Sequence, residues 1–340
     1  MQNKINLGII GKNFGYHVIY KAFSKNKKYK IKAFSFKTKK INKIKIPKSI
    51  KIYPSWKKLI QSKEINAVVI ATPPMLHKKI IKFAIKNNKH VFCEKPFTRS
   101  LRESNEICNI IRRRKKIFHM VNYEFSEIDA FNFFKSKILK NIKINKIFLN
   151  WFININKRPS TNWKENHSKG GGIIYNYVCH AIYYLEFLFG RIIAVKTNIL
   201  SAKKNKIKML EGVIFFNNSL SATLKIKVGL IKEKINPIHQ LNILDDKKNY
   251  VLETKLDSLS DQFRLIRLNR SSKKIEKILF SAKKNKNDFR INPTFQNSKK
   301  FSNWILRNKI QKPNFFDGKR MHLIINQMLI SSQKKKKIYI

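Results

Sequence analysis

Short apolar runs alternate with helical patterns through the first third of this 340-residue chain, and no other feature limits the fold as strongly. Each run is short and mostly apolar, as expected of a strand that is buried on both faces. Strands that alternate with helices form a parallel sheet with helices on both sides. We therefore expect a wound α/β domain, with strands at residues 5–10, 31–36, 66–71, 90–93 and 117–121.

The order of predicted elements changes from Tyr123 onward, where several strand patterns follow one another without helices between them. Turns such as "FFNNSL" and "LDDKKN" join strands into hairpins, so we expect a large, open and mostly antiparallel sheet. We divide the chain into an N-terminal α/β domain, residues 1–122, and a C-terminal α+β domain, residues 123–340. The second domain is expected to contain helices at 127–140, 173–189, 295–309 and 317–333 and strands at 145–155, 191–199, 210–216, 219–228, 238–244, 249–253 and 262–268.

The net charge of +55 raises the question of a polyanionic partner. Lysine, however, is spread through every segment together with isoleucine and asparagine, as an AT-biased genome would produce. We interpret most of this charge as solvated surface and expect no specific nucleic-acid partner. A polyanion-binding surface is the less favoured alternative, because charge alone gives salt-sensitive and unspecific binding.

The cysteines and the apolar segments favour a soluble, cytoplasmic protein. Cys93, Cys108 and Cys179 have neither metal-ligand nor redox spacing, and an odd number is a poor disulfide framework. The N-terminus lacks a signal-peptide layout, and the longest apolar run, "YVCHAIYYLEFLF", is too short to span a membrane. No residues have the spacing of a metal site, so we predict no metal.

The segment "GIIGKNFGYHV" links the first expected strand to a helix, where a dinucleotide-binding loop would lie. A helix N-terminus offers free N–H groups and a positive dipole to a pyrophosphate. Against the pattern G-x-G-x-x-G, Gly11 takes the first position, Asn13 the second and Tyr16 the third, with Phe14 and Gly15 between them. Asparagine tolerates left-handed backbone geometry, whereas the tyrosine is expected to crowd the helix–strand contact. By itself the motif is equally typical of an ordinary strand-to-helix turn.

The residues at the end of the second expected strand indicate whether the cofactor is NAD or NADP. An acidic residue here would bind the ribose 2′-hydroxyl of NAD, whereas basic residues favour the 2′-phosphate of NADP. The sequence has Ser35, Lys37 and further lysines, and it has no acid. We therefore predict NADP, with NAD as the alternative.

A lysine follows the fourth expected strand, in "HVFCEKPF". Pro96 cannot continue a sheet ladder, and the residue before a proline avoids the helical region, so the chain leaves the strand sharply. Lys95 is thereby placed on a stiff turn at the carboxyl end of the sheet, where open α/β sheets bind ligands. On these residues alone, a solvated turn lysine is the alternative.

Six segments, in order, resemble the glucose-fructose oxidoreductase / inositol dehydrogenase family, Gfo/Idh/MocA. The similarity spans nearly the whole chain, and its most specific parts are Glu-Lys-Pro after a strand and a glycine triplet followed by His180. The segments are "GKNFG", "VVIATPPMLH", "HVFCEKP", "MVNYEF", "GGGIIYNYVCHAIYYLEFLFG" and "PNFFDGKRMHLIINQMLISS".

This resemblance implies an NAD(P)-dependent oxidoreductase that moves hydride between a nicotinamide and a hydroxyl or keto carbon of a sugar, cyclitol or nucleotide-linked sugar. It implies an N-terminal Rossmann domain and a C-terminal domain whose open sheet often pairs subunits, so we expect a homo-oligomer. The lysine matching Lys95 contacts the reacting oxygen in this family, and the histidine matching His180 works in proton transfer. By the same resemblance, the residues lining the cofactor are Thr72, Pro73, His77, Glu94 and Asn122. For His77 a role in capping or supporting a helix start is favoured over a cofactor contact, and for Glu94 an ion pair with a nearby lysine is the alternative.

Asn176, four residues before His180, departs from the family, which usually has an aspartate there. An amide can orient a substrate hydroxyl but cannot accept a proton as a base, so any proton relay would rest on the histidine alone. Tyr123 and Trp163 are expected on the substrate side, although an ordinary core tryptophan explains Trp163 equally well.

Several signature positions differ from the family together, which keeps a second interpretation open. The chain could be a catalytically weakened dinucleotide-binding protein with a sensory or regulatory role. The positions concerned are Asn13, Tyr16, Asn176, Val178 and Tyr183.

Overall fold

The computed structural model describes residues 4–36, 46–155, 162–166, 169–203, 206–230, 237–254, 262–282 and 287–340. Contacts divide the chain into two compact units. Unit 1 comprises Met1–Glu124 and Arg290–His322, and unit 2 comprises Phe125–Phe289 and Leu323–Ile340. Residues 290–322 therefore pack with the first unit, whereas the expected division at residue 122 assigns them to the second.

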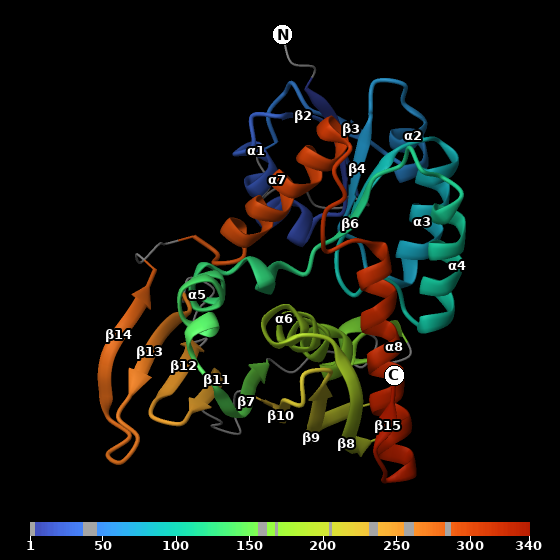
Figure 1. Cartoon of the computed structure of the whole chain (residues 1–340). Helices are drawn as coiled ribbons and strands as arrows, with labels where there is room; N and C mark the ends of the chain where they lie inside the picture. Colours follow the sequence, from blue (N-terminus) through green and yellow to red (C-terminus); the bar gives the residue numbers. More distant parts are fainter. Residues whose placement is uncertain are drawn as a thin grey trace. The chain divides into compact units, whose positions relative to one another are not determined.

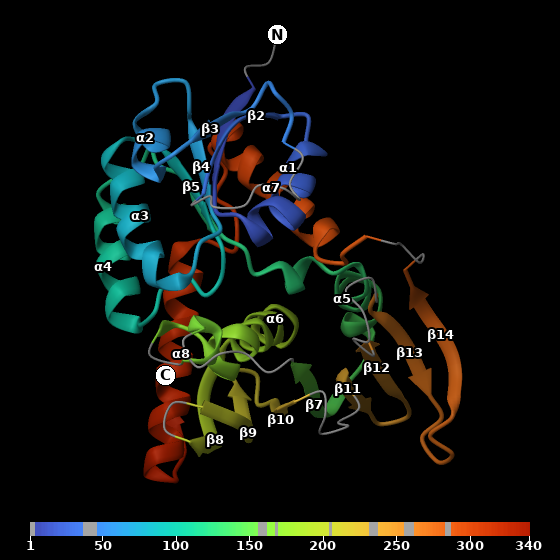
Figure 2. The same cartoon turned by 180° about the vertical axis from the view of Figure 1, so that it is seen from behind.

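Unit 1 contains the expected parallel sheet, in the order β3-β2-β1-β4-β5-β6. Five of its strands are predicted from the sequence, and the sixth, β3, is not. Helices α1 and α7 cover one face of this sheet, and α2, α3 and α4 cover the other (Figures 1 and 2). The strands are β1 (Ile5–Ile10), β2 (Tyr29–Ser35), β3 (Lys51–Tyr53), β4 (Ala67–Ile70), β5 (His90–Cys93) and β6 (His119–Val121). The helices are α1 (Lys21–Ser24), α2 (Trp56–Gln61), α3 (Pro74–Lys86), α4 (Leu101–Arg112), α7 (Ile291–Arg307) and the first part of α8 (Phe315–Lys334).

Helices α3 and α4 begin at start signals in the sequence. Pro74 is the first residue of α3, where its missing N–H costs no hydrogen bond. Ser100 caps α4, since its hydroxyl accepts a hydrogen bond from the backbone N–H of Glu103 at 3.3 Å. These signals place both helices directly after the turns that follow β4 and β5.

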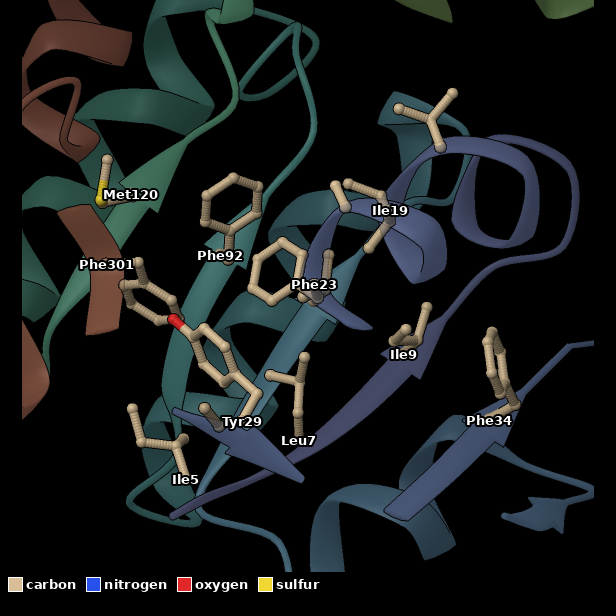
Figure 3. Close-up of a cluster of buried hydrophobic side chains, with 14 of the residues drawn as sticks. Ile5, Leu7, Ile9, Ile19, Phe23, Tyr29, Phe34, Phe92, Met120 and Phe301 are labelled. Carbon is tan, nitrogen blue, oxygen red and sulfur yellow. The ribbon is translucent and has the colours of Figure 1, made fainter. Parts of the chain in front are cut away.

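Aromatic side chains hold α7 against the sheet of unit 1 (Figure 3). Phe301 of α7 is fully buried, and its ring centroid lies 5.6 Å from that of Phe92 in β5. Phe23 of α1 contacts the same Phe92 ring at 5.1 Å. The Tyr29 hydroxyl donates to the Ser298 carbonyl at 3.0 Å. A helix distant in sequence is thus part of this core, which explains why residues 290–322 belong to unit 1.

Unit 2 is built on a nine-stranded sheet in the order β14-β13-β12-β11-β7-β10-β9-β8-β15. Neighbouring strands are antiparallel except β7 and β10, which confirms the mostly antiparallel sheet and both hairpins. The strands are β7 (Ile144–Ile155), β8 (Ile192–Lys203), β9 (Lys206–Phe216), β10 (Ser221–Leu230), β11 (Ile238–Asp245), β12 (Asn249–Thr254), β13 (Arg264–Leu268), β14 (Ile275–Ser281) and β15 (Ile338–Tyr339).

The helices of unit 2 are less regular than the sequence predicts. The expected helix over 127–140 is divided into α5 (Asp129–Phe133), a π-helical turn (Phe134–Ile138) and a 3₁₀ turn (Leu139–Asn141). The expected helix over 173–189 begins as a π-helical turn, η7 (Ile174–Val178), and continues as α6 (Cys179–Phe189). Within the described part of the chain, no helix combines the length and the apolar composition needed to cross a bilayer.

Candidate active site

Four expected site residues follow the carboxyl ends of adjacent strands in unit 1. Gly11 comes after β1, Thr72 lies on the turn after β4, Glu94 follows β5 and Asn122 follows β6. These strands are consecutive in the sheet, and parallel strands end at the same edge. The four positions therefore form one row along the edge where open α/β sheets bind ligands.

Gly11 provides a turn that a residue with a side chain could not make. Its φ is +131°, and its N–H donates to the Ser35 carbonyl at the end of β2 at 3.0 Å. A Cβ on Gly11 would lie 2.2 Å from the carbonyl oxygen of Ala71. Glycine thus lets the loop after β1 pass directly over the turn that follows β4.

Gly15 is the first residue of a π-helical turn, η1 (Gly15–Tyr20), which leads from the loop after β1 into α1. A Cβ on Gly15 would lie 3.4 Å from Ile9 and 3.6 Å from Ala71, which are ordinary contact distances. Tyr16 is half-buried; its ring packs against the core of unit 1 and stacks on Tyr20, with centroids 5.7 Å apart. The helix therefore does not need glycine at position 15 for its packing on the sheet.

The remaining residues of the loop differ in exposure. Asn13 is exposed and Phe14 is half-buried, with the Arg290 guanidinium 5.1 Å from the centroid of its ring. Ser35 is buried, and its carbonyl holds Gly11. Lys37 lies outside the described residues, so the preference for NADP based on this segment stays a prediction.

His77 connects two of the loops along this edge. Its side chain is fully buried, with Nε2 2.8 Å from the Thr72 carbonyl oxygen and Nδ1 3.0 Å from the Pro96 carbonyl oxygen. The Cys93 sulfur lies 3.4 Å from Nδ1. Burial lowers the pKa of His77 below its usual range. The imidazole therefore braces the turns after β4 and β5, and a cofactor contact by its side chain stays a prediction.

Glu94 and Asn122 form the buried polar part of the row. The Asn122 amide donates to Oε1 of Glu94 at 2.6 Å, and its backbone N–H donates to the Cys93 carbonyl at 2.8 Å. Burial raises the pKa of Glu94 to about 8, and the neighbouring Glu124 adds to this increase. The Asn122 hydrogen bond and the charge of Lys95 act in the opposite direction.

Lys95 is half-buried on the turn between Glu94 and Pro96. Its charge lowers the pKa of the Glu94 carboxyl, so cation and carboxyl share one environment at the end of β5. Tyr123, which follows Asn122, is buried at 1% exposure.

These residues fit a nicotinamide dinucleotide. The loop at Gly11 leaves no room for a side chain, as the tight turn at the first glycine of a dinucleotide-binding loop requires. The Thr72 hydroxyl is buried and has no hydrogen-bond partner within the described residues, so it can bond to a polar group of a ligand. Glu94 and Asn122 add an acceptor and an amide further along the same edge.

Three expected residues lie in unit 2, around the helix that follows the glycine triplet. His180 is 3% exposed, and its ring stacks on that of Phe125, with centroids 4.4 Å apart and planes at 22°. The Asn176 amide donates to the Lys164 carbonyl at 3.2 Å. Asn176 lies in the π-helical turn η7, a geometry frequent at functional sites.

Trp163 is held against the glycine triplet. A Cβ on Gly171 would lie 2.0 Å from the Trp163 carbonyl oxygen, and the Gly171 N–H donates to the Asn166 carbonyl at 2.9 Å. The indole itself is half-buried. Within unit 2, the structure thus joins Trp163 to the segment that carries Asn176, while the row with Lys95 belongs to unit 1.

Two groups of buried polar residues in the structure are not indicated by the sequence. In unit 1, Thr294 and Asn297 of α7 contact Asn122. In unit 2, His239 stacks on Trp151 with centroids 3.9 Å apart, and its Nε2 lies 2.9 Å from the Tyr184 hydroxyl. Alternating burial along β11 could have indicated His239 as an inward-facing residue. Thr294 lies before the expected start of its helix, so no helical face could be assigned to it.

Comparison with known families gives two matches to the Gfo/Idh/MocA oxidoreductases. The model described as "Oxidoreductase family, NAD-binding Rossmann fold" matches residues 5–123. The model described as "Oxidoreductase family, C-terminal alpha/beta domain" matches residues 135–263. Together they cover most of both expected domains, in the expected order.

Known proteins resemble parts of the sequence and the whole fold. An uncharacterised oxidoreductase of Synechocystis sp. is 30% identical over 151 residues, which are 43% of this chain and 40% of that protein. Levoglucosan dehydrogenase of Pseudarthrobacter phenanthrenivorans is 29% identical over 147 residues, 41% of this chain and 37% of that protein. The matched stretch thus spans less than half of either relative. A solved levoglucosan dehydrogenase in complex with NADH shares the fold over 99% of both chains, with a TM-score of 0.79 at 16% identity.

Proposed function

This chain belongs to the Gfo/Idh/MocA family of oxidoreductases, and from that membership we propose that it transfers hydride between a nicotinamide cofactor and a hydroxyl or keto carbon of a sugar or related polyol. The observation that carries the proposal is the row at the carboxyl edge of the parallel sheet. There Lys95 follows the buried Glu94 directly. The sugar class is taken from the relative named levoglucosan dehydrogenase.

Lys95 is proposed to stabilise the reacting oxygen. The nicotinamide, when bound, supplies or accepts the hydride, and the substrate oxygen gains negative charge in the transition state. An ammonium group held on the stiff turn before Pro96 can donate a hydrogen bond to that oxygen, and such fixed donors are usually the largest single catalytic contribution.

His180 is proposed to accept or donate the substrate proton, since a neutral imidazole does so near neutral pH. Asn176 would orient the substrate hydroxyl, because an amide cannot take the proton. Trp163 and Tyr123 are proposed to border the substrate.

Cofactor choice and assembly belong to the same proposal. The family model is that of an NAD-binding Rossmann fold, and the absence of an acid among residues 35–40 favours NADP over NAD.

We further propose a homo-oligomer formed through the sheet of unit 2. Support comes from Ile275 and Ile278 of β14, which are 50% and 53% exposed. Light scattering of the purified chain would test the assembly.

Substitution of Lys95 by methionine tests the catalytic proposal. We expect turnover on a panel of sugars, polyols and keto-sugars to fall about a hundredfold or more, because the developing charge loses its fixed donor. The dissociation constants of NADPH and NADH, measured by fluorescence titration, should change little. Lys86→Met is the matched control, since Lys86 is an exposed lysine at the end of α3, just before the chain enters the amino end of β5.

Two results would contradict the proposal. Equal turnover of Lys95→Met and the unmodified protein would show that Lys95 does not contribute to the reaction. Binding of dinucleotide without turnover of any compound in the panel would favour the sensory role, which the replacement of the usual aspartate by Asn176 already motivates.

A further inference from the structure

Three residues of one helical face reach the row of site residues in unit 1. Arg290 precedes α7, and Thr294 and Asn297 follow at spacings of four and three, so all three lie on the same side of the helix. Thr294 and Asn297 are both 0% exposed. Polar side chains are rarely buried so completely unless they make hydrogen bonds.

Asn297 fixes the orientation of the Asn122 amide. Its Nδ2 donates to Oδ1 of Asn122 at 3.1 Å, which turns the NH2 group of Asn122 toward the other side. That NH2 group donates to Oε1 of Glu94 at 2.6 Å and to the Thr294 hydroxyl at 3.2 Å. Both N–H bonds of Asn122 thus have acceptors, and one of the two is the Glu94 carboxyl.

The charges around Glu94 come from three parts of unit 1. Glu124, beyond the end of β6, disfavours the ionised form of Glu94, whereas Lys95 on the turn after β5 and Arg290 before α7 favour it. Arg290 also lies 5.1 Å from the Phe14 ring of the dinucleotide loop. The start of α7 therefore acts on the site row at two places, after β1 and after β5.

We propose that α7 is a positioning element of the cofactor site, in which Asn297 and Thr294 orient the Asn122 amide so that it holds Glu94 as a hydrogen-bond acceptor for the nicotinamide half of the dinucleotide. This inference rests on the proposed function, because it assigns a partner to the site row. Asn297 and Thr294 touch no reacting atom and act through Asn122. Binding of the dinucleotide thereby depends on a helix that comes after strands β7 to β14 of unit 2 in the sequence.

The ionisation of Glu94 tests this proposal without any ligand. We would follow the carboxyl carbon of Glu94 by NMR across pH in protein labelled with ¹³C-glutamate, with Glu94→Gln to assign the signal. Asn297→Leu removes the donor to Asn122 at similar volume, and Thr294→Val removes the second acceptor. Each substitution should raise the pH at which half of Glu94 is ionised, by up to about one unit. The reason is that the ionised carboxyl loses an oriented hydrogen-bond donor, which changes the ionisation equilibrium by up to about tenfold.

Ser302→Ala is the matched control on the same helix. The Ser302 hydroxyl accepts from the Asn26 amide at 3.3 Å, so its loss removes a buried hydrogen bond of α7 remote from Asn122. It should lower stability without moving the Glu94 midpoint. In an Asn122→Ala background, Asn297→Leu should no longer move the midpoint, because its effect passes through that amide.

Cofactor affinity is the second measurement. At pH 7, Asn297→Leu should weaken NADH and NADPH binding by about threefold to tenfold, as expected for a lost buried hydrogen bond.

Two results would overturn the positioning role. One is an unchanged ionisation midpoint of Glu94 in both Asn297→Leu and Thr294→Val, and the other is a midpoint that Asn297→Leu still shifts in the Asn122→Ala background. If the unmodified chain binds neither NADH nor NADPH, the proposed function fails, and the NMR titration still decides whether α7 orients Asn122.

Discussion

Glu94 is a carboxyl placed where water cannot solvate its charge. It is 6% exposed, and a second buried carboxyl, Glu124 at 1% exposure, lies in the same unit. The hydrogen bond from Asn122 and the charges of Lys95 and Arg290 compensate this only in part, so the pKa of Glu94 rises to about 8. The carboxyl that we propose as an acceptor for the dinucleotide is therefore kept at some expense in stability.

The sign of the pH effect follows from that shift. The folded pKa of Glu94 lies above the value of about 4.3 expected for an unfolded chain, so the folded state retains a proton that the unfolded state releases. Glu94 contributes its full stabilisation at pH values below its pKa in the unfolded chain. This contribution to the free energy of unfolding is lost as the pH rises to about 8, its pKa in the folded protein. We predict that Glu94→Gln flattens this decline, which is at most about 1.4 kcal/mol per pH unit. Urea denaturation from pH 4 to pH 9 measures it.

Glu64→Gln is the control for that experiment, because Glu64 is an exposed glutamate of the same unit. Its stability curve should follow that of the unmodified protein at every pH. A decline of equal slope in Glu94→Gln would show that other groups cause the pH dependence.

At the scale of elements, the turn from β1 into the first helix separates the roles of two glycines. Gly11 combines φ of +131° with a backbone oxygen 2.2 Å from any added Cβ. Gly15 has only ordinary side-chain contacts, the nearest at 3.4 Å. The motif in the sequence does not distinguish these roles, since both residues are simply glycines near a strand end.

We predict that Gly11→Ala destabilises the protein by roughly 1–3 kcal/mol or more, because a non-glycine residue in this backbone region is strained and its Cβ meets Ala71. Binding of NADH and NADPH should weaken with it. Gly15→Ala should be neutral or slightly stabilising, since alanine favours helix by about 1 kcal/mol over glycine. Thermal denaturation of the two variants provides the comparison, and equal effects would refute the assignment.

Secondary structure was predictable wherever burial repeats with a clear period. Strands β1, β4, β5 and β6 of the parallel sheet are mostly apolar and buried, and those of unit 2 after α6 follow one another through recognisable turns. β14 was missed because most of its residues are exposed, and β3 because it is short and only partly covered. The π-helical turns before α6 and after α5 were not foreseen, because their sequences have the same periodicity as an ordinary helix.

At the scale of the whole molecule, 74 basic residues stand against 19 acidic ones. A net charge of this size opposes compaction through self-repulsion. The repulsion is screened over about 10 Å at 0.1 M salt and over shorter distances as salt rises.

We therefore predict that the melting temperature at pH 7 rises as NaCl increases from low to high concentration. A gain of about 1 kcal/mol would appear as roughly 2–4 °C for a chain of this size. The same series near pH 10.4 is the control, since this is the sequence pI, at which the net charge is close to zero. A melting temperature that falls with NaCl at pH 7 would mean that local ion pairs outweigh the repulsion.

The sequence by itself determined the α/β class of the first unit, the antiparallel sheet of the second and the family, because periodic burial and motifs such as Glu-Lys-Pro are local properties of the chain. It also indicated Gly11 and Lys95 as residues that follow strands, and the resemblance to the family added Thr72, Glu94 and Asn122. The strand order of the sheet then places all five along one edge. Only the tertiary structure decided that α7 belongs to unit 1 and orients Asn122 through Asn297. That contact joins residues separated by 175 positions, and no local pattern encodes which distant helix will cover a given face.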